Sequence, residues 1–250
     1  TGAVDAITTG DYNVGVGDGA LTSNTTGYEN IAIGVNALFT NTTGGENTAN
    51  GYYALYSNNA IGNTAMGRVA LQNNTTGGDN VAIGGSALRA NTTASNNVAT
   101  GSYALTANTT GAYNTANGTS ALRANTTASN NTAYGYATLR LNTTGANNTA
   151  TGYRALYSNT TGGNNVAVGD SAMENNTVGT LNAAVGTQAL RLNSSGLRNV
   201  ALGYGALYSN TTASYNTATG SNALNANTTG TENTALGYGA GDNITTGSSN

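Results

Sequence analysis

Small apolar, β-branched and polar residues recur along the chain at every seventeenth position, as in the step from Asn13 to Asn30. Each repeat opens with Asn, and the step from Asn47 to Asn63, one residue shorter, is the single departure from this spacing. The repeats begin at Asn13, Asn30, Asn47, Asn63, Asn80, Asn97, Asn114, Asn131, Asn148, Asn165, Asn182, Asn199, Asn216 and Asn233. Their consensus is N-(T/V)-A-x-G-x-x-A-L-x-x-N-T-T-(G/A)-x-x, and we number its positions 1 to 17. We interpret residues 1–12 as a partial leading repeat and residues 13–250 as a single repeat domain.

Positions 1 to 4 of the repeat predict a short β-strand. Position 2 is β-branched in every repeat except at Ala183, and β-branched residues favour strands. The glycine at position 5 ends the strand, either because its φ is positive or because the neighbouring coil approaches closely. Asn-Thr-Thr-Gly at positions 12 to 15 predicts a turn. The Ala-Leu stretch between them fits a second strand or a single helical turn, and the residues leave both open.

A repeat of this length is too short for a helical hairpin and suits one coil of a β-solenoid. We therefore predict an all-β chain that forms a parallel β-solenoid (β-roll) of 14 stacked 17-residue coils. Its thin core consists of Ala at positions 3 and 8 and Leu at position 9, whereas Arg89 and Arg123 at position 10 are expected on the surface. The predicted core leucines are Leu38, Leu55, Leu71, Leu88, Leu105, Leu122, Leu139, Leu156, Leu190, Leu207 and Leu224.

Asparagines at positions 1 and 12 would stack in two columns, in which side-chain amides hydrogen-bond from coil to coil. Most position-12 residues also open an Asn-x-Thr/Ser sequon. One hypothesis is therefore a row of N-glycans along a surface fibre, with the flanking Thr as further sugar sites. The other is that good turn chemistry yields these sequons by accident. The candidate glycosylation sites are Asn24, Asn41, Asn74, Asn91, Asn108, Asn125, Asn142, Asn159, Asn193, Asn210 and Asn227.

Two further sets of positions vary from coil to coil. Positions 2 and 4 are apolar together, as at Val166 and Val168, or polar together, as at Thr149 and Thr151. They either line a roomy interior or form an oligomer interface. Tyr, Phe and Arg gather at positions 6 and 10, where they either bind a ligand or pack between coils.

Composition removes several classes of function. The chain has 7 basic residues, all Arg, and a net charge of -3, which is too sparse a positive charge for nucleic-acid binding or for a basic membrane-surface helix. No apolar run approaches the ~20 residues of a membrane-spanning helix, so no membrane span is expected. Without His, Cys or Lys, and with scattered carboxylates, no acid/base pair or activated nucleophile can be proposed, and we expect no enzyme and no catalytic residues.

Two glycine-rich stretches invite a phosphate-binding or calcium-binding interpretation. "GVGDGA" at residues 15–20 and "GYGAGDN" at residues 237–243 are ordinary copies of the repeat. They lack the P-loop lysine and the repeated Asp of a calcium-binding β-roll. We therefore expect neither a cofactor nor a metal site.

The strand motifs resemble those of a known family. "NIAIG" at residues 30–34, "NVAIG" at 80–84, "NVAVG" at 165–169 and "NVALG" at 199–203 are similar to the head repeats of YadA-like trimeric autotransporter adhesins. The full unit, with "ALYSNTTG" at 155–162, is similar to Asn/Thr/Gly repeats of bacterial surface proteins and phage tail fibres. The resemblance implies a parallel β-roll assembled as a trimer and displayed on a bacterial surface to bind matrix or other cells.

The leading functional hypothesis is a structural repeat body of an extracellular fibre, filament or surface adhesin. Its expected partner is another copy, by head-to-tail stacking or as a trimer, and the pattern runs unchanged into Asn250 as such stacking requires. A phage tail-fibre or adhesin shaft that binds cell-surface glycan is the alternative. An ice-binding solenoid is a third hypothesis, prompted by the threonine columns, although adjacent Thr-Thr pairs do not form flat rows.

Overall fold

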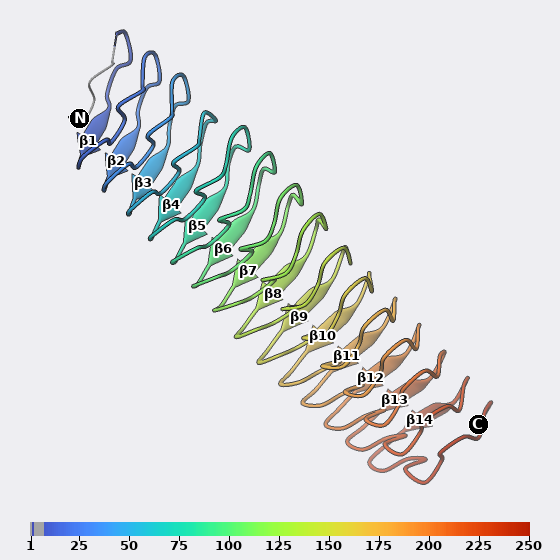
Figure 1. The fold of residues 1–250 in the computed structure, drawn as a ribbon. Helices are drawn as coiled ribbons and strands as arrows, with labels where there is room; N and C mark the ends of the chain where they lie inside the picture. Colours follow the sequence, from blue (N-terminus) through green and yellow to red (C-terminus); the bar gives the residue numbers. More distant parts are fainter. Residues whose placement is uncertain (1, 3–7) are drawn as a thin grey trace. The chain divides into compact units, whose positions relative to one another are not determined.

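The computed structural model describes Gly2 and residues 8–250, in two compact units, Thr1–Ala128 and Ser129–Asn250. The first unit contains β1 (Val14–Val16), β2 (Ile31–Ile33), β3 (Thr48–Asn50), β4 (Thr64–Met66), β5 (Val81–Ile83), β6 (Val98–Thr100) and β7 (Thr115–Asn117). The second contains β8 (Thr132–Tyr134), β9 (Thr149–Thr151), β10 (Val166–Val168), β11 (Ala183–Val185), β12 (Val200–Leu202), β13 (Thr217–Thr219) and β14 (Thr234–Leu236). Each coil contributes one strand, as Figure 1 shows.

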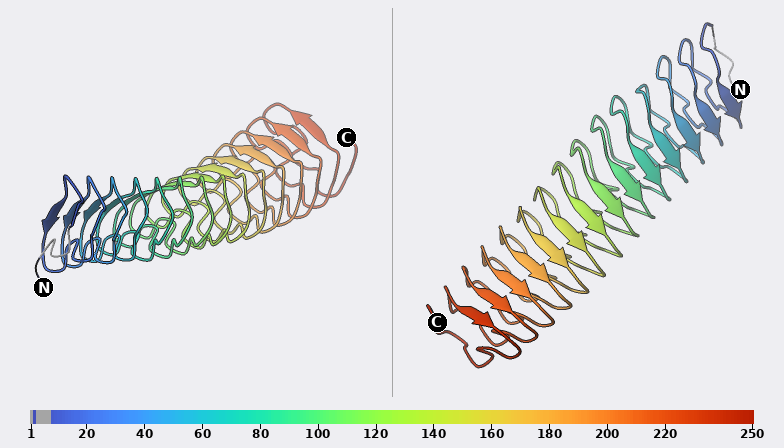
Figure 2. Two further views of the ribbon diagram at one scale, coloured as in Figure 1. Left: turned by 90° about the horizontal axis from the view of Figure 1, so that it is seen from above. Right: turned by 180° about the vertical axis from the view of Figure 1, so that it is seen from behind.

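The predicted fold class is confirmed, because both units are all-β parallel solenoids. Within each unit, every strand pairs in parallel with the next one along the chain (Figure 1, Figure 2). The pairing keeps identical repeat positions together: Val166 lies opposite Ala183, and Ala167 opposite Ala184. One period of the sequence is therefore one turn of the solenoid.

The strands turn a single side chain inward. Alanine at position 3 is fully buried, as at Ala32 and Ala150, whereas positions 2 and 4 point outward. Val166 and Val168 retain 41% and 37% of their surface. The hypothesis that positions 2 and 4 line a roomy interior is therefore wrong, because successive side chains of a strand point to opposite faces.

The leucines predicted as core side chains all lie in the interior. None of them exposes any surface, and in each unit they lie beside the buried alanines of position 8. Met173 occupies the leucine position in its coil and is also fully buried. Three apolar positions in each coil therefore supply most of the core.

The Ala-Leu stretch is neither a second strand nor a helical turn. It is a bent segment in which the leucine itself adopts a left-handed conformation, with φ near 50° at Leu38 and Leu88. The Leu38 amide donates to the Ala54 carbonyl of the next coil at 3.1 Å, so the segment still bonds from coil to coil. This repeated bond and full burial hold the leucine in a conformation that non-glycine residues rarely adopt.

The short coil that begins at Asn47 is repaired by one side chain. In the first coils of the unit, the Thr25 and Thr26 amides donate to the Thr42 carbonyl. The Thr42 and Thr43 amides instead donate to Oδ1 of Asn59, at 2.9 and 2.8 Å. A side-chain carbonyl therefore replaces a backbone carbonyl where one residue of the repeat is missing.

Candidate functional site

Both asparagine columns are internal hydrogen-bond ladders. Nδ2 of Asn91, at position 12, donates to Oδ1 of Asn74 at 2.8 Å and to the Ala94 carbonyl at 2.9 Å. Nδ2 of Asn80, at position 1, donates to Oδ1 of Asn63 at 3.1 Å and to that same Ala94 carbonyl at 2.9 Å. In this coil the two columns thus share a carbonyl at position 15 and join the strand to the turn, and most other coils repeat the arrangement.

This arrangement contradicts the N-glycan hypothesis for the position-12 residues. A glycan replaces one hydrogen of Nδ2 and needs space in solvent, whereas these side chains are fully buried and, as at Asn91, donate both hydrogens. The turn interpretation of the sequons therefore holds. The sites that the structure rules out are Asn24, Asn41, Asn74, Asn91, Asn108, Asn125, Asn142, Asn159, Asn193, Asn210 and Asn227.

The threonines beside these asparagines differ from one another. The Thr143 hydroxyl, at position 13, donates to the Thr160 carbonyl of the next coil at 2.9 Å, and Thr160 repeats the bond to Thr177. Thr144 and Thr161, at position 14, are exposed. Position 13 therefore stabilises coil stacking, and position 14 is the threonine open to solvent.

One face of each unit is an uncovered β-sheet that carries apolar side chains. Within this sheet face, positions 2 and 4 of successive strands form two parallel rows. The large hydrophobic residues exposed there are Val14, Val16, Ile31, Ile33, Met66, Ile83, Val98, Tyr134, Val166, Val168, Val185, Val200, Leu202 and Leu236. Buried core residues therefore alternate with exposed apolar ones along every such strand.

The aromatic and arginine residues at positions 6, 7 and 10 mostly contact each other between coils. Phe39 and Tyr56 stack with ring centroids 5.3 Å apart, and Tyr136 and Tyr153 at 5.6 Å. The Arg123 guanidinium lies 5.5 Å from the Tyr103 ring centroid, within the range of a cation–π contact. For these residues the packing interpretation holds.

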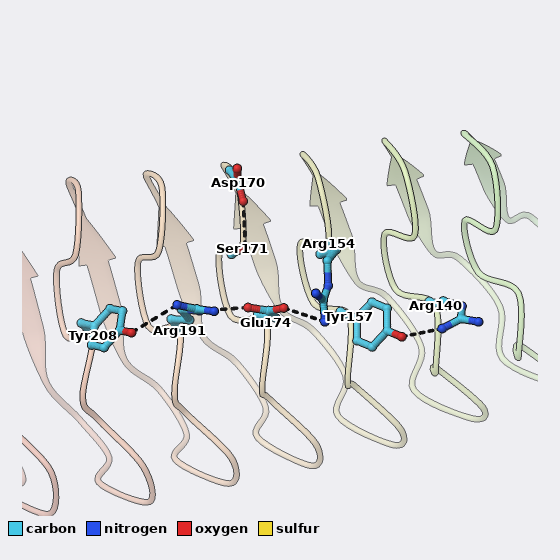
Figure 3. A network of polar contacts seen from close by, with 8 residues as sticks. All are labelled: Arg140, Arg154, Tyr157, Asp170, Ser171, Glu174, Arg191 and Tyr208. Atoms are coloured by element: carbon cyan, nitrogen blue, oxygen red, sulfur yellow. Dashed lines mark hydrogen bonds and ion pairs between the residues drawn. The ribbon is translucent and has the colours of Figure 1, made fainter.

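Glu174 lies at the centre of a cluster of charged and aromatic side chains (Figure 3). Its side chain is nearly buried and accepts from Nη2 of Arg154 at 2.8 Å and from Nε of Arg191 at 2.9 Å. Arg191 also donates to the Tyr208 hydroxyl at 3.2 Å, and the Arg154 guanidinium lies 4.4 Å from the Tyr157 ring centroid. The hydrogen bond to Glu174 raises the pKa of Arg191 above its ordinary value.

A cavity lies beside residues of this kind in each unit. The cavity in the first unit has a volume of about 380 Å³ and is lined by Tyr52, Tyr53, Arg68, Val69, Gln72, Ser86 and Arg89. The cavity in the second unit has a volume of about 170 Å³ and is lined by Tyr136, Ala137, Arg140, Tyr153, Arg154 and Tyr157. Both combine tyrosine with arginine, and neither has an acidic residue in its lining.

The described residues contain no group of three or more acidic, His or Cys side chains able to hold a metal ion. Within the same residues, no helix has the length and apolar character to cross a membrane. A comparison with models of known protein families finds no match, and a comparison with curated proteins finds none either. The class that the fold defines is the tandem-repeat parallel β-solenoid.

Proposed function

We propose that this chain is the structural body of an extracellular fibre or surface adhesin and that it associates laterally with further copies of itself. The observation that carries the proposal is the exposed sheet face. It exposes Val, Ile, Leu and Met side chains on many of the strands, with Thr and Asn at the same positions on the others, and an apolar surface of this kind is typical of a protein interface.

The interior supports the same role. Within each unit, coils bond to their neighbours through the strand and the Ala-Leu segment and, in most coils, through two asparagine columns, so successive coils have much the same environment. A solenoid of this type lengthens by adding coils, because each repeat contacts mainly its neighbours. Such regularity suits a protein whose function is extension and display.

The proposed location at a cell surface rests on the resemblance of the strand motifs to adhesin head repeats. The residues that carry it, as in "NVAVG" at 165–169, form the strand and the glycine that ends it. In the resembling family, copies associate laterally as trimers. The sheet face favours that lateral mode over head-to-tail stacking, because it runs along the side of the coils.

Sedimentation velocity tests the association. The variant Val168→Lys/Val185→Lys charges the sheet face, and Val178→Lys/Leu181→Lys makes the same change at a turn and at position 17 outside that face. All four side chains are similarly exposed, at 37% to 48% of their surface. We expect the wild type and the turn variant to sediment as oligomers and the sheet variant as single chains.

Two results would contradict the proposal. The first is a wild-type chain that stays monomeric at every concentration. The second is equal loss of association in both variants, which would show that added positive charge acts without regard to the face that carries it. Circular dichroism checks that both variants keep the wild-type fold.

A further inference from the structure

The cavity of the first unit contains the two unpartnered arginines of the described chain. Arg123, Arg140, Arg154, Arg191 and Arg198 each contact a tyrosine ring, and two of them also pair with Glu174. Within the described residues the side chains of Arg68 and Arg89 have no ion pair, hydrogen bond or ring contact, yet both line this one cavity. Two exposed guanidinium groups therefore face one space with no negative charge in its lining.

Two small residues follow one another in the coil that contributes Arg89, and the second of them, Ser86, lines the cavity. Gly85 occupies position 6, where several other coils carry tyrosine, and a Cβ atom built there would lie no closer than 4.0 Å to its nearest neighbour, Oγ of Ser102. Ser86 at the next position is short and nearly buried. In the two preceding coils position 6 is occupied by Tyr52 and Arg68, whose side chains line the cavity together with Ser86.

An aromatic wall completes the cavity. The rings of Tyr52 and Tyr53 lie 4.4 Å apart at their centroids with an angle of 41° between their planes. Tyr53 in turn stacks on Tyr56 at 4.8 Å, and Tyr56 on Phe39. A ring supported by this stack is held in place, while Tyr52 remains half exposed.

We propose that this cavity binds an acidic saccharide, that is, a sugar ring carrying a carboxylate or sulfate group. A guanidinium presents a planar fork of donors that matches a carboxylate or sulfate with two parallel hydrogen bonds. The tyrosine rings offer an apolar face to the C–H side of a sugar, and Gln72 and Ser86 offer polar groups to its hydroxyls. The volume of about 380 Å³ lies at the low end of ligand pockets, which suits one or two sugar rings.

In the cavity of the second unit, the lining arginines have partners within the protein. There Arg140 donates to the Tyr157 hydroxyl, and Arg154 pairs with Glu174 while lying over the Tyr157 ring. Its volume is less than half that of the first cavity. Tyrosine and arginine alone therefore do not define the site, whose distinguishing feature is the unpaired charge of Arg68 and Arg89.

Isothermal titration calorimetry on the whole chain tests the proposal with four probes. These are a hyaluronan tetrasaccharide, which is acidic, chitotetraose, which is neutral, a tetraglutamate peptide, which is acidic without a sugar ring, and inorganic sulfate. We expect the hyaluronan fragment to bind more tightly than the other three. Arg68→Ala/Arg89→Ala should weaken it at least about tenfold, as loss of a charge-assisted hydrogen bond does.

The matched control is Arg123→Ala/Arg198→Ala, which removes the same net charge elsewhere and should leave hyaluronan binding within about twofold of the wild type. Tyr52→Ala should weaken hyaluronan and leave any sulfate binding unchanged. Because the site does not depend on self-association, the single-chain sheet-face variant should bind the same fragment.

Several results would overturn the proposal. They are no binding of the hyaluronan fragment, equal binding of chitotetraose, and a control variant that loses as much affinity as the cavity variant. Equal binding of tetraglutamate or sulfate would also overturn it, in favour of a general anion site without saccharide recognition.

Discussion

Most buried asparagines in this chain use both hydrogens of the side-chain amide. In both columns Nδ2 bonds to an amide oxygen in the preceding coil and to a backbone carbonyl, and the side chains expose no surface. Where the short coil breaks the spacing, Oδ1 of Asn41 is left without a hydrogen-bond partner. The ladder therefore depends on an amide standing at the same height in consecutive coils.

Replacing one rung with its acid should be costly. Asn91→Asp puts a second acceptor where Nδ2 donates to Asn74 and Ala94, so two hydrogen bonds become repulsive contacts. We expect the free energy of unfolding to fall by about 3 kcal/mol or more, measured by urea titration. The control Asn96→Asp makes the same charge change at an exposed position and should shift stability by less than about 0.5 kcal/mol. Equal effects of the two changes would contradict the ladder.

Two adjacent glycines differ in whether the backbone requires glycine at that position. Gly84, at position 5, has φ of +133°, and a Cβ there would lie 2.6 Å from the backbone carbon of Gly101 in the next coil. Gly84→Ala should therefore lower the unfolding free energy by about 1–3 kcal/mol for the backbone strain alone. Gly85→Ala has open space and should be neutral to slightly stabilising. Thermal unfolding of the two variants tests this difference. Similar unfolding midpoints for both would be evidence against the close approach of coils at Gly84.

At the scale of elements, the strand and the turn of each coil can be predicted from the sequence. The conformation of the Ala-Leu segment between them cannot. The alternation around Ala167 and the glycine after Val168 predict a strand and its end, because their period and residue types are local properties. The left-handed leucines could not be predicted, since the conformation of Leu88 is imposed by burial and by its bond to the Ala104 carbonyl in the next coil. The outward direction of positions 2 and 4 was left open for the same reason.

The cavity and the Glu174 cluster could not be predicted from the sequence either. Position 10 carries Arg, Tyr or Phe in many coils, and both binding and packing fit that composition. Which role applies depends on neighbours one coil away: Arg191 has Glu174 and Tyr208, whereas Arg89 has neither a carboxylate nor a tyrosine ring in contact. Only the order in which the coils stack reveals this difference. A glycine at position 6, as at Gly85, does indicate open space beside the backbone there.

The Glu174 cluster should hold its coils together through charge. Glu174→Gln removes the partner of Arg154 and Arg191, which are themselves 38% and 32% exposed. Because solvent screens these partly exposed arginines, we expect a loss of about 1–2 kcal/mol, below the cost for fully buried pairs. Urea titration measures it, with the exposed Glu29→Gln as the control for the same charge change.

The pKa of Arg191 determines the pH range over which the Glu174 cluster contributes to stability. Since it is raised in the folded chain, the stability that Arg191 adds is fully present below the ordinary arginine pKa and is lost only as pH rises through the folded value. The difference between wild type and Glu174→Gln should therefore not shrink between neutral and mildly alkaline pH. A difference that disappears in that range would contradict the pairing.

At the scale of the whole molecule, two kinds of surface are distributed differently. The apolar sheet face recurs on strands of both units, as expected of a property that serves assembly along the chain. The cavity with unpaired arginines is found once among the two described cavities, as expected of a binding site added to a repetitive framework. The proposed fibre body and the proposed saccharide site are therefore separable by mutation.

Electron microscopy of the purified chain tests the central claim most directly. If the chain is the body of a fibre that associates through its sheet face, wild-type particles should be extended multi-chain assemblies, and Val168→Lys/Val185→Lys should leave thinner single solenoids. Single particles of the same width in both samples, or wild-type particles without elongated form, would contradict the account.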